Sequence, residues 1–136
     1  MNKNEISLED LHARILSFIE KAKTVTENIN FDIQHEIDEK ITFSSIKGMN
    51  IFRVIQEAIN NSIKYANASK VEIVIVKKEE KLLISIKDNG VGFDINTIDL
   101  GNGLSNMEKR MSEIDGSVKI NSKKSEGTEI MLRVFL

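Results

Sequence analysis

Apolar residues recur along this chain at two spacings, one typical of helices and the other of strands. Helical spacing covers residues 7–28, with Ser7 as the expected N-cap, residues 47–66 and residues 104–116. The three apolar stripes are Leu8, Leu11, Ile15, Phe18, Ala22 and Val25; Ile51, Ile55, Ala58, Ile59, Ile63 and Ala66; and Leu104, Met107, Met111 and Ile114. Each helix is therefore expected to cover an apolar surface with one face.

Alternation of apolar and polar residues predicts the strands. They cover residues 31–37, 70–76, 82–87, the segment around Val118 and Ile120, and residues 128–134. The charged link at residues 77–81 joins two of them into an antiparallel hairpin. The order helix, strand, helix, hairpin, helix, hairpin predicts an α+β fold, with the helices gathered on one face of a sheet.

Composition limits the classes of protein that this chain can represent. Its 136 residues, 40% of them hydrophobic, fit a single domain over residues 1–136. It has no cysteine, which excludes disulfides and thiolate metal sites, and no apolar run of about 20 residues that could span a membrane. A net charge of −2, one tyrosine and no tryptophan argue against a nucleic-acid surface. We expect a cytoplasmic domain that contacts neither nucleic acid nor membrane directly.

Asp88 follows an apolar strand and precedes a glycine-rich turn. It shares the inward side of the strand with three aliphatic residues, so its carboxylate is expected to be buried. A buried carboxylate needs a donor from the protein or from a ligand, and the amino group of a purine would serve. Gly90 and Gly92 would let a flat ligand approach the backbone closely. A local Asp-Asn-Gly turn explains the same residues, and the motif alone leaves both interpretations open.

A polar stripe runs along the second predicted helix. Glu57, Asn60, Asn61 and Lys64 lie at positions i, i+3, i+4 and i+7, which predicts one stripe opposite the apolar face. A solvated helix surface would have the same pattern, but two adjacent asparagines are poor helix formers. An amide oxygen could complete the shell of a Mg²⁺ ion bound to nucleotide phosphates, and Lys64 could add a positive charge there.

A glycine-marked loop precedes the third predicted helix. The polar stretch at residues 94–103 is suited to a mobile loop over a site, and it ends in Gly101-Asn102-Gly103-Leu104. Ser105 and Glu108 have the spacing of a capping box. The free N–H groups and dipole at such a helix start favour an anion, although Gly-x-Gly by itself is common in loops.

Taken together, these segments resemble the GHKL ATPase superfamily. Residues 56–66 are similar to its N box, residues 88–93 to its first glycine box, residues 101–107 with Arg110 to its second, and residues 127–130 to its closing Gly-Thr strand. The resemblance runs from about residue 30 to the end. The pattern Gly-x-Gly-Leu-x-x-Met-x-x-Arg resembles one branch, the sensor histidine kinases related to bacterial nitrate sensors and to the membrane-fluidity thermosensor.

The resemblance implies a two-layer Bergerat-type sandwich with a mixed, mostly antiparallel sheet that binds ATP and Mg²⁺. Asp88 would accept a hydrogen bond from the adenine amino group, and Thr128 would support it through water. Asn61 would ligate Mg²⁺, Lys64 would contact phosphate, and Tyr65 would flank the nucleotide. The pocket and lid would be shaped by Gly90, Gly92, Gly101, Gly103 and Leu104.

The same resemblance implies a catalytic role for Glu57, Asn61 and Lys64. Glu57 corresponds to the residue that activates water in hydrolytic members of the superfamily. Neither His12 nor His35 fits the phosphoacceptor motif, so the histidine would lie on a separate dimerisation domain, and a response regulator would be an indirect partner. The helix in residues 1–28 could be a linker from that domain, and the parent could be a membrane-bound kinase. The alternatives are a stand-alone serine kinase of the superfamily and a nucleotide-sensing module without transfer activity.

Overall fold

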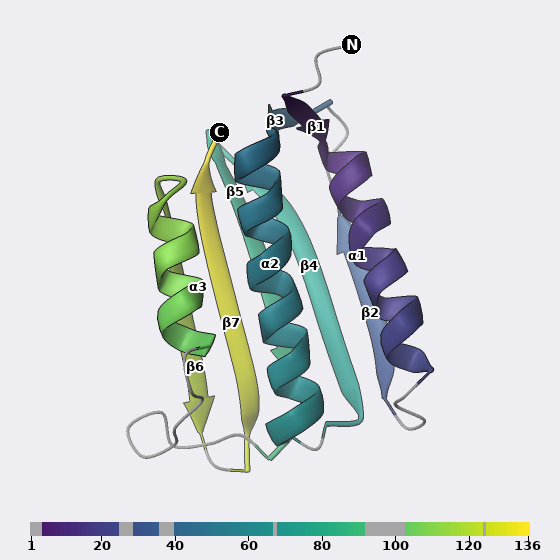
Figure 1. The fold of residues 1–136 in the computed structure, drawn as a ribbon. Coiled ribbons are helices and arrows are strands. Elements are labelled where there is room, and N and C mark those ends of the chain that lie inside the picture. Colours follow the sequence, from purple (N-terminus) through teal and green to yellow (C-terminus); the bar gives the residue numbers. More distant parts are fainter. Residues whose placement is uncertain (1–3, 25–28, 36–39, 67, 92–102, 124) are drawn as a thin grey trace.

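A computed structural model describes residues 4–24, 29–35, 40–66, 68–91, 103–123 and 125–136, with only the backbone of residues 65, 66 and 103 (Figure 1). The helices are α1 (Leu8–Lys23), α2 (Ser45–Asn61), the π-helical turn η1 (Ser62–Ala66) and α3 (Gly103–Ser112). The strands are β1 (Glu5–Ser7), β2 (Asn30–His35), β3 (Thr42–Ser44), β4 (Lys70–Lys78), β5 (Lys81–Asp88), β6 (Gly116–Lys123) and β7 (Gly127–Phe135).

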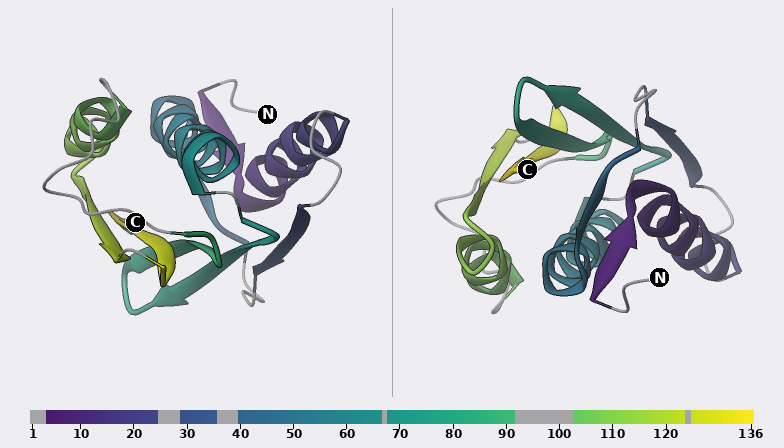
Figure 2. Two further views of the ribbon diagram at one scale, coloured as in Figure 1. Left: turned by 90° about the horizontal axis from the view of Figure 1, so that it is seen from below. Right: turned by 90° about the horizontal axis from the view of Figure 1, so that it is seen from above.

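A five-stranded sheet in the order β2-β4-β5-β7-β6 forms one layer of the molecule. β2 pairs in parallel with β4, and the remaining neighbours pair antiparallel. The three helices cover one face of this sheet, as Figures 1 and 2 show from three directions. The predicted α+β architecture is therefore confirmed, including the hairpin β4–β5 and the hairpin β6–β7. None of the helices in the described residues is long and apolar enough to cross a membrane.

The core lies between the sheet and the helices. Strand register aligns alternate aliphatic side chains of the three central strands toward the helices: Val71, Ile73 and Ile75, Leu82, Ile84 and Ile86, and Ile130, Leu132 and Val134, none more than 4% exposed. Each such side chain stabilises the fold by about 1.5–3 kcal/mol relative to an exposed one. Asp88 continues this inward phase, opposite Val71 on one side and Thr128 on the other.

The first helix is an integral part of this core. Ser7 caps α1 as predicted, and its hydroxyl accepts a hydrogen bond from the N–H of Asp10 at 3.1 Å. The core positions include Ile19, which is 2% exposed, whereas the predicted Phe18 is only partly buried. Val25 falls outside the described residues.

Several predicted boundaries were wrong. Residues 47–66 were expected to form one α-helix, but α2 begins at Ser45 and its α-helical hydrogen bonding gives way at Ser62 to the wider π-helical turn. α3 begins at Gly103, so Ser105 lies inside the helix and does not cap it. The short antiparallel pair of β1 and β3 was missed, because strands of three residues are too short to show a period.

Two histidines that do not fit the phosphoacceptor motif contact each other between α1 and β2. The rings of His12 and His35 have centroids 4.6 Å apart at an interplanar angle of 78°, and their Nδ1 atoms lie within hydrogen-bonding distance. One neutral ring can donate to the other, but two protonated rings would repel. Burial, and then the charge of His35, lower the pKa of His12 from its ordinary value of 6.5.

We expect the free energy of unfolding to decrease as the pH falls from about 8 to about 5, because the unfolded chain binds a proton at His12 more readily. This stability is fully present above the ordinary pKa of 6.5 and is lost as the pH falls toward the lower pKa of the folded state. Urea unfolding at several pH values checks this. The free energy of unfolding should decrease less with falling pH in His12→Gln than in the unsubstituted protein. Equal decreases in the two proteins would contradict the expectation.

Candidate functional site

Asp88 lies at the end of β5, where the residue is 5% exposed. Its Oδ1 accepts hydrogen bonds from the N–H groups of Gly90 at 3.0 Å and Thr128 at 3.2 Å, and its Oδ2 accepts one from the Ser62 hydroxyl at 2.7 Å. A carboxylate has about four acceptor positions. Three are used, so Oδ2 retains the capacity for one further donor.

The contact between Asp88 and Gly90 is the local turn that the sequence left open as an alternative. The same carboxylate also accepts the long-range hydrogen bonds from Ser62 and Thr128. The local turn and the buried carboxylate therefore occur together and do not exclude each other. Asn89 fixes the turn to the start of β4, because its Oδ1 accepts from the N–H groups of Ser69 and Lys70, both at 2.9 Å. These bonds hold the Asp88 carboxylate in one orientation.

Ser62 is a site residue that the sequence reasoning missed. It is the first residue of η1 and is 4% exposed. Its hydroxyl lies 2.7 Å from Asp88 Oδ2 and 3.3 Å from the carbonyl oxygen of Ala58. The only sequence signal was its place in the N box, because the contact joins segments 26 residues apart.

Replacing Ser62 with alanine should lower the free energy of unfolding by about 1.5–3 kcal/mol, because a buried carboxylate loses a donor. Nucleotide affinity should change much less, since Oδ2 keeps its capacity for an outside donor. Urea unfolding and nucleotide titration measure the two effects. Ser85→Ala is the matched control, because that hydroxyl has a long contact of 3.4 Å to a partly buried Glu129. If Ser62→Ala proved as stable as this control, the hydrogen bond would not contribute as described.

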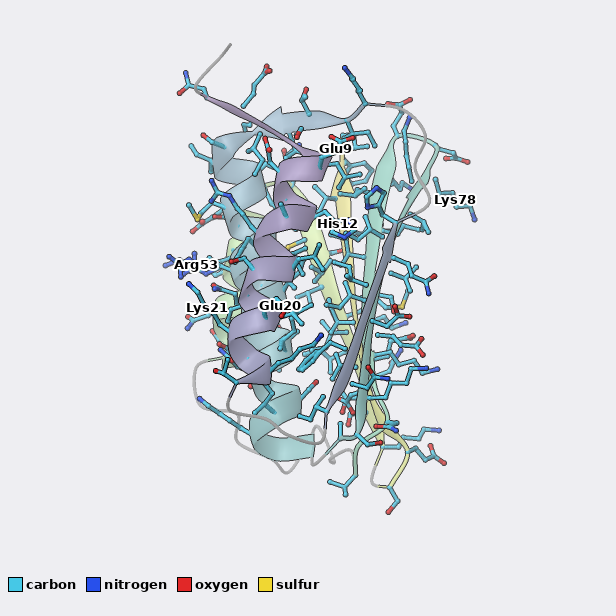
Figure 3. All side chains as sticks on the ribbon, turned by 90° about the vertical axis from the view of Figure 1, so that its right-hand side faces the viewer. Glu9, His12, Glu20, Lys21, Arg53 and Lys78 are labelled. Carbon is cyan, nitrogen blue, oxygen red and sulfur yellow. The ribbon has the colours of Figure 1, made fainter. Side chains whose placement is uncertain are left out.

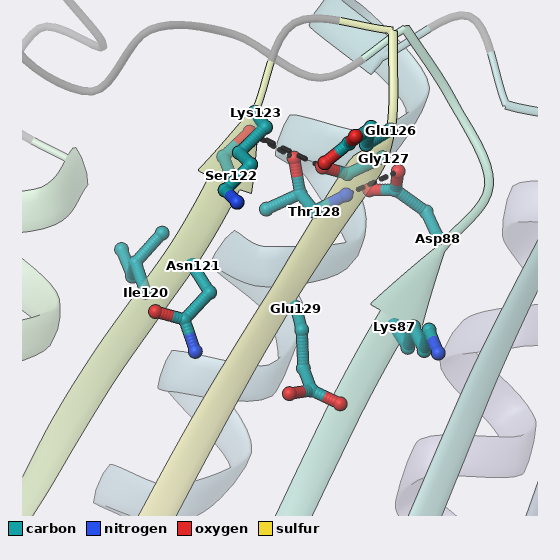
Figure 4. A pocket seen from close by; sticks show the side chains of 10 residues that line it. All are labelled: Lys87, Asp88, Ile120, Asn121, Ser122, Lys123, Glu126, Gly127, Thr128 and Glu129. Atoms are coloured by element: carbon teal, nitrogen blue, oxygen red, sulfur yellow. Dashed lines mark hydrogen bonds between the residues drawn. The ribbon is translucent and has the colours of Figure 1, made fainter.

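The Gly-Thr segment packs directly against Asp88. Gly127 has a φ of +83°, and a Cβ there would collide with the carbonyl oxygen of Asp88. Thr128 contacts Asp88 through its backbone N–H, while its hydroxyl pairs with that of Ser122 at 2.8 Å. Water-mediated support of adenine by Thr128 stays a prediction. Asp88 and Thr128 line a hollow where β5 and β6 end and β7 begins (Figure 4), and its volume is about 530 Å³.

Asn61 ends α2 and is 8% exposed, which corrects the prediction that its stripe lies opposite the apolar face. Asn61 lies at the edge of the polar stripe that is nearest the core, whereas Lys64 is exposed. Its Nδ2 is buried and has no hydrogen-bond partner among the described residues. A buried N–H donor without a partner is costly, so this amide nitrogen lowers the stability of the free protein.

The residues that the structure describes contain no group of three or more histidine, aspartate or glutamate side chains that could hold a metal ion. A Mg²⁺ ion would therefore need oxygen ligands from phosphate and water in addition to one amide oxygen. Mg²⁺ is commonly bound in that way, since it keeps several waters and takes few protein ligands. Asn61 carries such an amide oxygen at the end of α2.

Glu57 and Asn60 line a second hollow of about 240 Å³ between α2 and α3, together with Asn106 and Arg110. Asn50 holds the two helices together. It is 6% exposed, and its Nδ2 donates to the carbonyl oxygen of Arg110 at 2.9 Å and to Glu113 Oε2 at 3.2 Å. The predicted catalytic Glu57 thus lies beside the helix that carries the second glycine box.

The remaining predicted site residues are placed as follows. Gly103 is the first residue of α3, and Leu104 is partly buried against the core. Tyr65 belongs to η1. Gly92 and Gly101 lie outside the described residues. Hydrogen bonds thus join Asp88, Gly90 and Thr128 directly, while Glu57 lines a separate hollow.

Comparison with known proteins identifies the family of this chain. The sequence model of the family described as histidine kinase-, DNA gyrase B-, and HSP90-like ATPases matches residues 47–136. The sensor protein VraS of Staphylococcus aureus (strain COL) is 34% identical over 137 residues, which cover 93% of this chain and 39% of VraS. The chain therefore spans well under half the length of that relative.

Two solved structures have the same fold. The catalytic domain of histidine kinase ThkA has a TM-score of 0.78 at 18% identity, covering 99% of this chain and 96% of that one. The mycobacterial sensor histidine kinase MprB has a TM-score of 0.75 at 13% identity, covering 96% and 95%. At such identities the likeness concerns the fold, and the family follows from the sequence match. The chain belongs to the ATPase family that histidine kinases share with DNA gyrase B and HSP90.

Proposed function

We propose that this chain is the ATP-binding catalytic domain of a sensor histidine kinase. It donates the γ-phosphoryl group of Mg-ATP to a histidine on a separate dimerisation domain, and a response regulator is the indirect partner. The domain belongs to the cytoplasmic part of the kinase. The observation that carries the proposal is the Asp88 carboxylate, which is buried, held by three donors and still able to accept one more.

The remaining acceptor capacity of Asp88 suits adenine. The exocyclic amino group of adenine donates a hydrogen bond, whereas guanine has an acceptor oxygen at the same ring position. The Asp88 carboxylate would repel the guanine oxygen, and its remaining acceptor position would have no donor. Asp88 therefore selects ATP over GTP, and Gly90 lets the flat base approach the turn.

The phosphates would lie toward Asn61 and Lys64. Bound Mg²⁺ would supply positive charge against the negative charge that develops during transfer. Asn61 would hold the ion through its amide oxygen, and the exposed Lys64 would neutralise a further phosphate charge. Tyr65 would flank the nucleotide, while Gly92, Gly101 and Gly103 would let the lid fold over the phosphates.

Glu57 would serve the acceptor side of the reaction. Its carboxylate lines the hollow between α2 and α3, so an incoming imidazole would meet it there. A carboxylate that accepts a hydrogen bond from one ring nitrogen orients the other nitrogen for attack on phosphorus. We assign Glu57 this orienting role.

The test uses this chain, ATP labelled on the γ-phosphate, Mg²⁺ and the separately made histidine hairpin of the cognate kinase. Acid-labile label should appear on the hairpin and be absent from a hairpin whose histidine is replaced by glutamine. Acid-stable label on a serine would identify a serine kinase instead. ATP binding without any transfer would identify a nucleotide-sensing module.

A further inference from the structure

A groove lies between α1 and α2, on the surface of the helix layer. It has a volume of about 330 Å³. Its walls have identical spacing on the two helices, i, i+3, i+4 and i+7, and they consist of Arg14, Ser17, Phe18 and Lys21 from α1 and Met49, Phe52, Arg53 and Gln56 from α2. Each wall therefore presents about two helical turns, or roughly 10 Å, to a partner.

Apolar side chains lie along the middle of this groove. The rings of Phe18 and Phe52 meet edge to face, with centroids 6.3 Å apart at an angle of 67°. Met49 is 44% exposed, and Ile46, one turn before it on α2, is 70% exposed. Exposed apolar residues that are continuous with a groove, and not scattered singly, mark interaction surfaces.

Positive charge surrounds these apolar residues. Arg14, Lys21 and Arg53 contribute to the walls, and no aspartate or glutamate does so. The ion pairs seen between described residues, such as Lys23 with Glu20 and Lys70 with Glu72, include none of the three groove cations. Arg53 instead donates a long hydrogen bond of 3.4 Å to Gln56. Figure 3 shows Lys21 and Arg53 projecting toward the same side of the molecule.

This concentration of cations contrasts with the whole chain, whose net charge is −2. The groove shares no lining residue with the Asp88 hollow, although Arg53 and Gln56 also line the hollow beside Glu57. Nucleotide binding at Asp88 therefore does not explain the arrangement of Arg14, Lys21 and the two phenylalanines.

We propose that the groove between α1 and α2 docks an acidic amphipathic helix of a protein partner. A helix whose apolar face carries residues at i, i+3, i+4 and i+7 can set them between two walls of the same spacing. Glutamates or aspartates beside that face would meet Arg14 and Lys21 on one wall and Arg53 on the other. The groove is open to the surface, which suits a helix better than a small ligand that needs enclosure.

The test uses a fluorescent helical peptide of about 15 residues, with leucines at i, i+3, i+4 and i+7 and glutamates at the flanking positions. It is titrated with this chain while ATP is present at saturation, so that the nucleotide site cannot capture the acidic peptide. We expect saturable binding that weakens as salt rises toward about 1 M. A peptide with lysines in place of the glutamates should not bind.

Three variants locate the site. Arg14→Glu with Lys21→Glu should weaken peptide binding about tenfold or more, because attraction becomes repulsion. Lys78→Glu with Lys119→Glu makes the same change of charge at exposed strand positions and should leave binding unchanged. Met49→Gln should weaken binding severalfold through lost apolar contact, and nucleotide affinity should stay the same in every variant.

Three results would overturn the proposal. The first is equal weakening by the groove and control charge reversals, which would reduce the effect to net charge. The second is peptide binding whose amide chemical-shift changes lie away from α1 and α2. The third is loss of peptide binding combined with tight, Arg14- and Lys21-dependent association with anionic lipid vesicles, which would assign the groove to a membrane surface.

Discussion

Replacing Asp88 with asparagine is expected to weaken ATP binding at least about 100-fold, because a donor replaces an acceptor that faces the adenine amino group. The amide oxygen can still accept from the N–H groups of Gly90 and Thr128. The amide nitrogen then takes the place of Oδ2, so the adenine amino group meets a second donor and has no partner. Isothermal titration or fluorescence competition with ATP measures the loss.

The fold should survive Asp88→Asn because Ser62 can adapt. Its hydroxyl lies 3.3 Å from the carbonyl oxygen of Ala58 and can turn to donate there, while it accepts from the new amide nitrogen. The unfolding midpoint should therefore change little, in contrast to Ser62→Ala. An unchanged ATP affinity in Asp88→Asn would disprove the assignment of adenine to Asp88.

Replacing Asn61 with alanine is expected to reduce phosphotransfer at least about 100-fold, because the proposed Mg²⁺ ligand is lost. The same substitution should leave the free protein as stable as before, or more stable by about 1 kcal/mol, since it removes a buried amide nitrogen without a hydrogen-bond partner. Most substitutions at a position 8% exposed destabilise a protein, so this combination is distinctive.

Two measurements check the Asn61 expectation: transfer to the histidine hairpin over a range of Mg²⁺ concentrations, and thermal unfolding without nucleotide. Asn60→Ala is the matched control, as it changes the neighbouring and more exposed asparagine. An Asn61→Ala protein with normal transfer and normal Mg²⁺ dependence would rule out the ligand role. A strongly destabilised one would show that the amide has a structural partner.

The order and type of the main elements could be predicted from the chain because hydrophobic periodicity is a local property. The stripe of α2 and the alternation in β4, β5 and β7 each span enough residues to distinguish a period of 3.6 from a period of two. The elements that were predicted wrongly or missed either are short or are defined by their backbone hydrogen bonding. β1 and β3 have three residues each, and the π-helical turn at Ser62 changes the backbone bonding without a change in the apolar pattern.

The candidate site was predictable in part for the same reason. The inward direction of Asp88 follows from the phase of β5 alone. Ser62 and the backbone N–H of Thr128 are its partners only because η1 and β7 are brought to the end of that strand. Asn61 was predicted to lie on a stripe opposite the apolar face, because a helical projection does not indicate how far neighbouring elements cover the edge of that face.

The sequence by itself determined the layered α+β architecture, the family and the inward carboxylate, since these depend on local spacing and short motifs. Only the tertiary structure decided that this carboxylate has three donors and room for a fourth, that Asn61 is buried with an unpartnered amide, and that α1 and α2 enclose a basic groove. Those properties arise from contacts between segments distant in the chain. The hydrogen-bond capacity that a residue leaves unused is known only when all its neighbours are in place.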